Sequence, residues 1–294
     1  MSQPKKKAIV PEQSSTPSND GRSIVEKKSM TTQLVDSKEK EYAALELLSR
    51  FGLSTRKVAS FCIDDPKGQV IRSMLAKKWL CTHRNSKVPA FTRTFQAEHE
   101  VITLTALGLR MFYQYRGQDI TYHEINPAKI NYTHASHTLE GQIAVKNMLM
   151  HGLIRDYETE RMIDPENKLG PKKFDLVVIL NGEGCFGKRV GIEIELSAKY
   201  EKAMCETRKR ICQSLMQTNS QDEVEYAYVF YFIEQPIMQR YEAAFSAGAK
   251  IYHWLLNSKR KYVKGKIDLE IPDYLAARIL FFPIRNLKTL AVVQ

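Results

Sequence analysis

The stretch FDLVVILNGEGCFGKRVGIEIELSAK, residues 174–199, decides the fold of the C-terminal half of the chain. Two apolar runs, residues 174–180 and 190–196, flank a glycine-rich segment at residues 182–187. Glycine-rich segments between apolar runs are typical of turns that join neighbouring strands. Apolar and acidic residues alternate in the second run, and this period of two is that of a strand. The stretch therefore predicts two strands joined by a turn.

Acidic side chains are concentrated on these two predicted strands. Asp175 begins the first, and Glu193 and Glu195 share one face of the second because they are two residues apart. Lys199 follows just beyond the strand end. Three carboxylates and an amine form a candidate site for a hard divalent cation, with Asp175, Glu193 and Glu195 as ligands of Mg²⁺ or Mn²⁺. Alternatively, the acids are only the solvated face of an amphipathic strand.

The composition is that of a globular protein with a sizeable core, since 43% of the 294 residues are hydrophobic. The sequence contains no apolar run of membrane-spanning length, and its Lys-, Ser- and Pro-rich start does not match a secretory signal. The five cysteines form no C-x-x-C pair. We therefore expect reduced thiols in a cytoplasmic protein and no structural zinc site.

The formal net charge of +11 favours an anionic partner, with nucleic acid as the first choice and an acidic membrane surface as the second. Residues 53–96 carry nine Lys and Arg against two Asp. Such a local excess is typical of a surface that faces DNA.

Residues 1–38 are polar and partly basic, which predicts a disordered basic arm. Residues 39–112 contain three helical patterns followed by a basic hairpin, the order of a winged helix-turn-helix. Its end, Leu104, Thr105 and Gly108, resembles the wing exit of many bacterial winged-helix regulators. A winged helix used only for protein contacts is the alternative. The residues expected to contact DNA are Arg56, Lys57, Arg72, Lys77, Lys78, Arg84, Lys87 and Arg93.

Residues 113–132 are expected to form a linker, and residues 133–294 an α/β domain with helices on both sides of its sheet. We expect helices at residues 133–153, 198–217 and 235–248, and strands at 155–160, 174–180, 190–196, 225–234, 249–256 and 277–282. Residues 259–266 are expected to form a basic loop.

This order of elements resembles the nucleases of the P-D-(D/E)-x-K fold, in which Asp lies on one strand and acid-x-Lys on the next. Phe174–Asp175 stands where that family has Pro-Asp, and Glu193–Ile194–Glu195 where it has acid-x-Lys. More narrowly, the predicted winged helix with His137–Thr138–Leu139, Asp175, Glu193, Glu195 and Lys199 is similar to the replication-relaxation proteins and to the related C class of plasmid mobilisation relaxases. The fold class expected is thus α/β (α+β), with an N-terminal winged helix followed by a restriction-endonuclease-like mixed sheet.

The resemblance implies metal-dependent nicking of one DNA strand at a plasmid or mobile-element origin in a bacterial cytoplasm. Asp175 and Glu193 would bind Mg²⁺ or Mn²⁺, and Glu195 would be a third ligand or a base. Lys199 would stabilise charge on the phosphate, and His137 would belong to the catalytic set. Conjugation coupling or accessory proteins are implied as further partners.

Two alternatives belong to other classes of function. One is a non-catalytic, sequence-specific DNA-binding accessory protein of replication or transfer whose nuclease-like domain is inactive. The other is a protein-interaction adaptor, which would leave the charge excess of residues 53–96 unexplained.

Overall fold

The computed structural model describes residues 21–84, 100–116, 130, 132–162, 174–218 and 225–284. The chain divides into two compact units, Met1–Glu39 and Lys40–Gln294. None of the helices within the described ranges has both the length and the apolarity needed to cross a membrane.

Helix α1, Gly21–Phe51, contains residues of both units. Of the segment expected as a disordered arm, residues 21–38 lie in this helix, and residues 1–20 lie outside the described ranges. No proline interrupts α1, and its sequence is rich in Glu, Lys and Leu, which favour helices. Leu45 and Leu48 of α1 are buried. Adding residues to an existing helix costs much less free energy than starting one, so the helix extends from these residues toward the N-terminus.

The second unit begins with the end of α1 and continues through α2 (Arg56–Cys62), α3 (Gln69–Ala76), the antiparallel strands β1 (Leu80–Arg84) and β2 (Glu100–Leu104), and α4 (Ala106–Arg116). Thr55 caps α2, since its hydroxyl accepts the Val58 N–H at 3.2 Å. Ser54 pairs with Ile102 of β2 through two backbone hydrogen bonds. This bridge ties the entry of α2 to the β1–β2 hairpin.

The segment Leu104–Gly108 locks the hairpin to the helices. The Thr105 hydroxyl donates to the carbonyl of Lys78 at 2.7 Å and accepts the Gly108 N–H at 3.0 Å, so it caps α4. Gly108 lies against the backbone of Trp79, and a Cβ atom at this position would overlap the Trp79 carbonyl oxygen. Only a glycine fits between α4 and the start of β1.

The remaining elements are α5 (Tyr132–Met150), β3 (Ile154–Thr159), β4 (Leu176–Leu180), β5 (Arg189–Glu195), α6 (Glu201–Met216), β6 (Tyr228–Ile233), α7 (Gln235–Phe245), β7 (Lys250–Leu256), β8 (Tyr262–Glu270), α8 (Asp273–Ala276) and β9 (Ile279–Pro283). Five strands form one sheet in the order β3-β4-β5-β6-β9. The pairs β3–β4 and β4–β5 are antiparallel, and β5–β6 and β6–β9 are parallel. The expected mixed α/β fold with a mixed sheet is confirmed.

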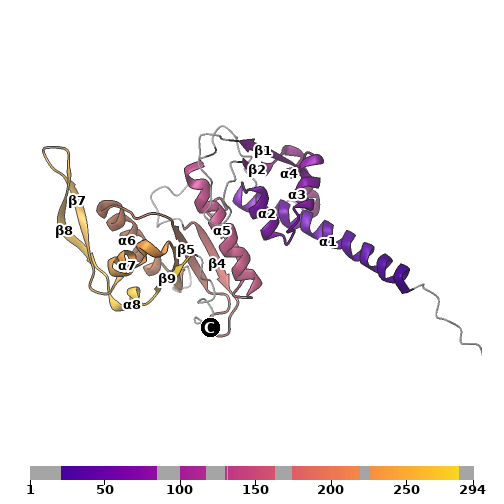
Figure 1. Ribbon diagram of the computed structural model, residues 1–294. Coiled ribbons are helices and arrows are strands. Elements are labelled where there is room, and N and C mark those ends of the chain that lie inside the picture. Colours follow the sequence, from indigo (N-terminus) through magenta and orange to yellow (C-terminus); the bar gives the residue numbers. More distant parts are fainter. Residues whose placement is uncertain are drawn as a thin grey trace, which may run out of the picture. The chain divides into compact units, whose positions relative to one another are not determined.

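Helices lie on both sides of this sheet (Figure 1), and side chains on both of its faces are buried. On one face, Leu176 and Ile194 join a core with Ala144 and Val145 of α5. That core also includes residues of α1 and α3. On the other face, side chains of β6 pack against α6 and α7. The segments expected as separate domains, residues 39–112 and 133–294, thus share one core within a single compact unit.

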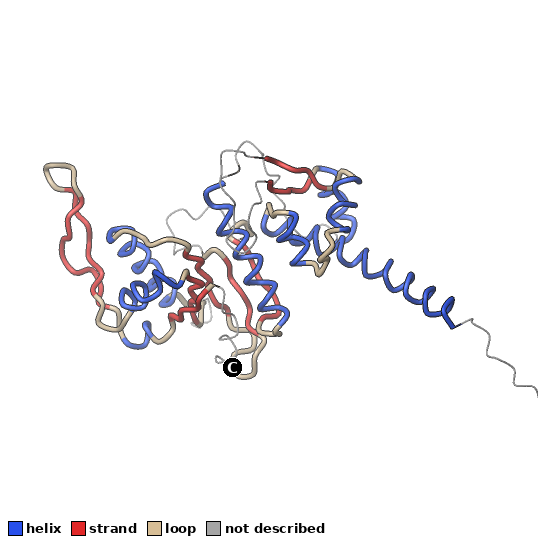
Figure 2. Tube along the Cα trace, viewed as in Figure 1, coloured by secondary structure: helices blue, strands red, loops and turns tan. Residues whose placement is uncertain are grey.

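Strands β7 and β8 form a separate antiparallel hairpin, which projects from α6 and α7 (Figure 2). The prediction that residues 249–256 belong to the main sheet is wrong, because β9 takes the position beside β6. The basic loop expected at residues 259–266 is the hairpin turn and the first half of β8. A β-forming composition identifies a strand without identifying its neighbour.

Two further boundaries differ from expectation. Helix α4 continues to Arg116 and α5 begins at Tyr132, so the predicted linker at residues 113–132 is helical at both ends, and residues 117–129 lie outside the described part. Helix α6 begins at Glu201 rather than at residue 198.

Candidate functional site

Glu193 and Glu195 are buried in the middle of the protein. They lie on β5, an interior strand between β4 and β6, and only 2% and 4% of their surfaces are exposed. Ile192 and Ile194 alternate with them and face the α5 side of the sheet. The alternative that these acids form a solvated face is therefore wrong, because α6 and α7 cover the second face.

Lys199 forms an ion pair with Glu195 across four residues. It lies in the irregular segment between β5 and α6, and 29% of its side chain is exposed. A buried carboxylate is costly unless a cation or hydrogen-bond donors compensate its charge. Lys199 supplies such compensation for Glu195, and its own side chain is partly exposed.

Asp175 lies immediately before β4, at the open end of the β4–β5 hairpin. Its carboxylate accepts the backbone N–H of Ile194 at 2.7 Å. Leu176 is the partner of Ile192, so the continued register places Asp175 across from Glu193. The structure thus brings Asp175 and Glu193 to neighbouring positions on adjacent strands.

The side chains of Asp175, Glu193 and Glu195 do not converge on a common point. In the described part of the chain, no group of three or more His, Cys, Asp or Glu side chains is arranged to hold a metal ion. Asp175 is directed at the Ile194 amide and Glu195 at Lys199. The structure brings the expected ligands into one region, but Asp175, Glu193 and Glu195 do not surround a common metal position.

The hydrogen bond of Asp175 leads to a prediction about stability. We expect Asp175→Ala to lower the free energy of unfolding by about 1–3 kcal/mol, because the Ile194 N–H then loses its acceptor in a partly buried position. Asp175→Asn should cost less, since an amide oxygen can still accept. Urea unfolding of both variants measures the difference. If Asp175→Ala is as stable as wild type, the hydrogen bond from Ile194 to Asp175 does not stabilise the fold.

Two buried tyrosines line the acidic region, and the sequence analysis did not identify them. Tyr231 on β6 pairs in register with Glu193, and Tyr241 of α7 lies beside it. Burial, followed by the charges of Glu193 and Asp175 among other neighbours, raises the pKa of Tyr231 well above its ordinary value. Both carboxylates therefore act on the same ring. Only the parallel pairing of β5 with β6 could have revealed this contact.

Tyr241 connects this region to Lys199. Its hydroxyl accepts the backbone N–H of Lys199 at 3.4 Å, and Arg240 donates to the Lys199 carbonyl at 2.9 Å. Burial raises the pKa of Tyr241 to about 12. Tyr241 therefore helps to position the backbone of Lys199, and Tyr231 packs between Glu193 and Tyr241.

His137 also lies near Asp175, in a cavity that Glu193 and Glu195 do not line. It belongs to α5 and lines a small cavity of about 110 Å³ together with Thr138, Glu160, Arg161 and Asp175. His137 is half-buried. The structure therefore places the histidine of the His137–Thr138–Leu139 motif beside Asp175.

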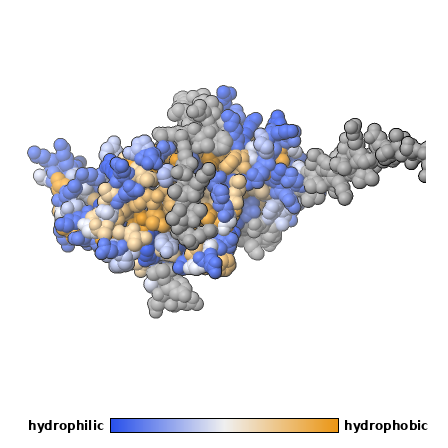
Figure 3. Space-filling view, turned by 60° about the horizontal axis from the view of Figure 1, so that its bottom comes forward, coloured by the Kyte–Doolittle hydropathy of each residue, from blue (hydrophilic) through white to orange (hydrophobic). Residues whose placement is uncertain are grey.

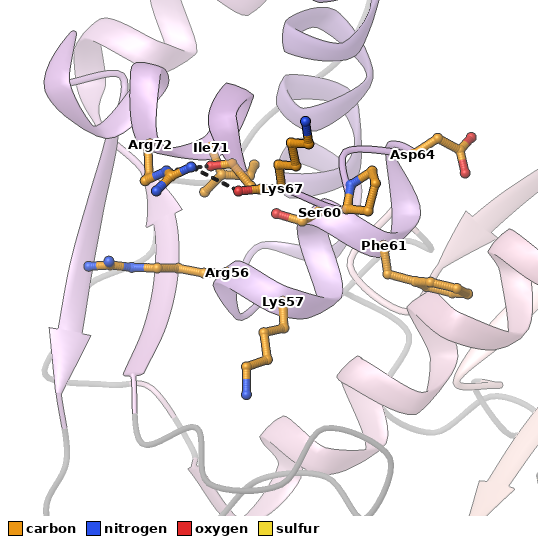
Figure 4. A pocket seen from close by; sticks show the side chains of 10 residues that line it. Arg56, Lys57, Ser60, Phe61, Asp64, Lys67, Ile71 and Arg72 are labelled. Atoms are coloured by element: carbon orange, nitrogen blue, oxygen red, sulfur yellow. Dashed lines mark hydrogen bonds between the residues drawn. The ribbon is translucent and has the colours of Figure 1, made fainter.

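A second candidate site is a concave basic surface formed by α2, α3 and the turn between them (Figure 4). It has a volume of about 780 Å³. Arg56 and Lys57 project from the start of α2, and Lys67 and Arg72 from the start of α3. The sequence analysis identified three of these cations and missed Lys67. We call these four residues the concave basic surface.

Two of these cations are held in position by neighbouring groups. The guanidinium of Arg72 donates to the carbonyls of Gly68 at 3.2 Å and Lys67 at 2.9 Å. Arg56 pairs with Glu100 of β2 at 3.3 Å. The surface therefore presents two positioned guanidinium groups beside two lysine ammonium groups, a combination suited to a polyanion.

The other expected DNA contacts have different environments. Lys77 forms an ion pair with Glu41 and lies 4.6 Å from the ring centre of Trp79. Its charge is thus partly used inside the protein. Lys78 and Arg84 are exposed. Lys87 and Arg93 lie outside the described residues.

No protein-family model, curated protein or solved structure matches this chain.

Proposed function

We propose that the protein is a divalent-metal-dependent DNA endonuclease of the relaxase type, which nicks one strand at a plasmid or mobile-element origin. The observation that carries this proposal is the buried pair Glu193 and Glu195 beside Asp175 and Lys199. Two carboxylates in the interior of a sheet destabilise a fold that apolar residues would fill more favourably. Such an arrangement is expected where the carboxylates serve chemistry.

The order of elements supports the proposal. The segment α5-β3-β4-β5-α6-β6 follows the α-β-β-β-α-β core of the P-D-(D/E)-x-K nucleases, with Asp175 and Glu193 on adjacent strands. The order α1-α2-α3-β1-β2, with the Ser54–Ile102 bridge beside the hairpin, resembles that of a winged helix. A DNA-binding segment and a nuclease-like site in one compact unit suit an enzyme that cuts DNA at a chosen position.

The donor set fits a hard cation in kind, because Asp175, Glu193 and Glu195 offer only carboxylate oxygens. These residues would hold Mg²⁺ or Mn²⁺, which supplies an activated water and neutralises phosphate charge. Lys199 compensates the charge of Glu195, and its ammonium would also stabilise charge on the scissile phosphate. Tyr241 and Arg240 hold the Lys199 backbone in position.

A supercoiled plasmid tests the proposed activity directly. The protein is incubated with plasmid and Mn²⁺ or Mg²⁺, and the open circular form is measured on a gel beside an EDTA control. Metal-dependent nicking supports the proposal. Intact plasmid with both metals, together with tight duplex binding, would instead support the accessory function.

The accessory function is a real second candidate because of two contacts. The Asp175 carboxylate accepts a backbone N–H, and Glu195 is paired with Lys199, so both acids have structural partners. An inactive nuclease-like domain would keep such contacts. The winged-helix segment would then provide the whole function by binding DNA.

The concave basic surface leads to a further prediction. Replacing Arg56, Lys57 and Arg72 with Gln should weaken duplex binding and reduce the slope of log K against log salt by about 0.9 for each phosphate that the variant no longer neutralises. Fluorescence anisotropy over a salt series measures that slope. Lys77 is paired with the buried Glu41, whereas Glu100, the partner of Arg56, is 38% exposed, so Lys77→Gln should change the slope less. An unchanged slope in the triple variant would place the DNA-binding surface elsewhere on the protein.

A further inference from the structure

The β7–β8 hairpin is a second basic feature, separate from both candidate sites. It is anchored at its base, where Ile251 and Ile271 are buried in the core beneath α6 and α7. Two backbone hydrogen bonds close this base, from Gly248 to Ile271 at 2.9 Å and from Ile271 to Ala249 at 3.1 Å. Beyond this base the strands project away from the five-stranded sheet (Figure 2).

Positive charge is concentrated at the far end of the hairpin. Residues 257–266 contain five Lys and Arg and no acidic residue. The two acids of the hairpin lie near its base, where Asp268 is paired with Lys209 of α6. Lys259, Arg260 and Lys261 at the turn are exposed. The hairpin end is predominantly hydrophilic, with a few hydrophobic residues among them (Figure 3, left).

Large apolar side chains accompany these cations. Leu255, Leu256, Tyr262 and Val263 are 40–57% exposed. Leu256 faces Tyr262 in register, and Leu255 faces Val263, so the two pairs lie on opposite faces of the ribbon. A membrane surface binds structures that are apolar on one face only. Lys264 lies on the same face as Tyr262, two residues away, and the basic turn lies beyond both apolar pairs. Apolar side chains on both faces, next to these cations, are instead suited to a ribbon enclosed by the two walls of a nucleic-acid groove.

The hairpin is also tied to the segment that carries Lys199. Lys264 of β8 pairs with Glu201 at 3.1 Å, and Lys202 lies 3.4 Å from the ring centre of Tyr262. Glu201 and Lys202 follow Lys199 by two and three residues. A DNA backbone that reaches Lys199 would therefore continue along the hairpin.

We propose that the β7–β8 hairpin is a duplex-DNA-binding arm, which binds phosphates through Lys259, Arg260 and Lys261 and lays its apolar side chains in a groove. This inference rests on the proposed DNA-directed function and adds a binding surface outside the winged-helix segment. The arm would grip the duplex beside the cleavage site, while the concave basic surface binds a different part of it.

The test removes charge at the turn without disturbing its backbone. The Asn257 side-chain oxygen accepts the backbone N–H groups of Lys259 at 3.0 Å and Lys261 at 2.9 Å, so changing these side chains leaves the turn intact. Lys259→Gln/Lys261→Gln should reduce the salt slope of duplex binding by about 1.8, at about 0.9 for each phosphate. The matched control, Lys188→Gln/Arg110→Gln, removes two exposed charges elsewhere and should leave the slope nearly unchanged. Binding is measured in EDTA and does not depend on nicking.

Each outcome has a definite meaning. A reduced slope in the hairpin variant with an unchanged control supports the arm, whether or not the protein nicks DNA. Equal slopes in both variants, with normal duplex binding by wild type, overturn the arm and leave the proposed function standing. Absence of duplex binding by wild type overturns both. Binding to phosphatidylserine vesicles that disappears in the hairpin variant, with duplex binding unchanged, would assign the hairpin to a membrane surface instead.

Discussion

Glu193→Gln is expected to reduce metal-dependent nicking of supercoiled plasmid by at least about 100-fold, the size of effect seen when one preorganised electrostatic group is removed from an active site. The substitution keeps the volume of the side chain and removes its charge. Because Glu193 is almost fully buried, the removal of that charge should leave the metal-free melting temperature unchanged or raise it. Duplex binding by the concave basic surface should also be retained.

A matched acid on the same sheet provides the control. Glu158 of β3 pairs with Arg189 at 3.0 Å and lies outside the acidic region. Glu158→Gln should nick at nearly the wild-type rate. Full activity of Glu193→Gln would end the nuclease-site proposal, whatever its stability. A large fall in stability would instead indicate that the carboxylate of Glu193 has a structural role.

The hairpin at residues 174–199 was predictable because its signal is local. Alternation with a period of two identifies a strand and assigns Glu193 and Glu195 to one face. It does not show whether that face is exposed. The burial of both acids depends on α6 and α7 covering the second face of the sheet, and on β6 lying parallel to β5. These arrangements are tertiary, so the sequence alone left the solvated alternative open.

For the same reason, the sequence could not predict the hydrogen bond of Asp175 or the positions of Tyr231 and Tyr241. A spacing along the chain shows that Asp175 precedes a strand, but its hydrogen bond to Ile194 depends on the register between β4 and β5. Tyr231 belongs to a run that was identified only as strongly β-forming. Its place beside the acidic region requires the pairing of strands more than thirty residues apart in the chain.

Local polar side chains hold the starts of α2 and α3. The boundaries of α2 and α3 follow from Thr55, which caps the Val58 N–H, and from Asp65, which accepts the Val70 N–H at 2.7 Å. The motif Leu104, Thr105 and Gly108 was identified only by its resemblance to a wing exit. Its physical basis is the close approach of α4 to the backbone of Trp79.

That close approach makes Gly108→Ala the substitution with the largest expected effect on stability. A Cβ atom at this position would overlap the carbonyl oxygen of Trp79, which is backbone and has little freedom to move. We expect the free energy of unfolding to fall by about 3 kcal/mol, the upper part of the range for overpacking, despite the better helix propensity of alanine. Urea unfolding measures this decrease.

Gly141 is the matched control, since it also lies within a helix, α5. A Cβ atom there would approach the methyl ends of Ile194 at 3.2 Å and Leu176 at 3.4 Å, and such side chains can shift by a few tenths of an ångström. Gly141→Ala should therefore be nearly neutral. If Gly108→Ala is equally neutral, α4 can move away from Trp79 and the motif does not lock the hairpin. If it destabilises the protein as expected, duplex binding should weaken with it, because the displaced β1–β2 hairpin carries Glu100, the partner that holds Arg56 on the concave basic surface.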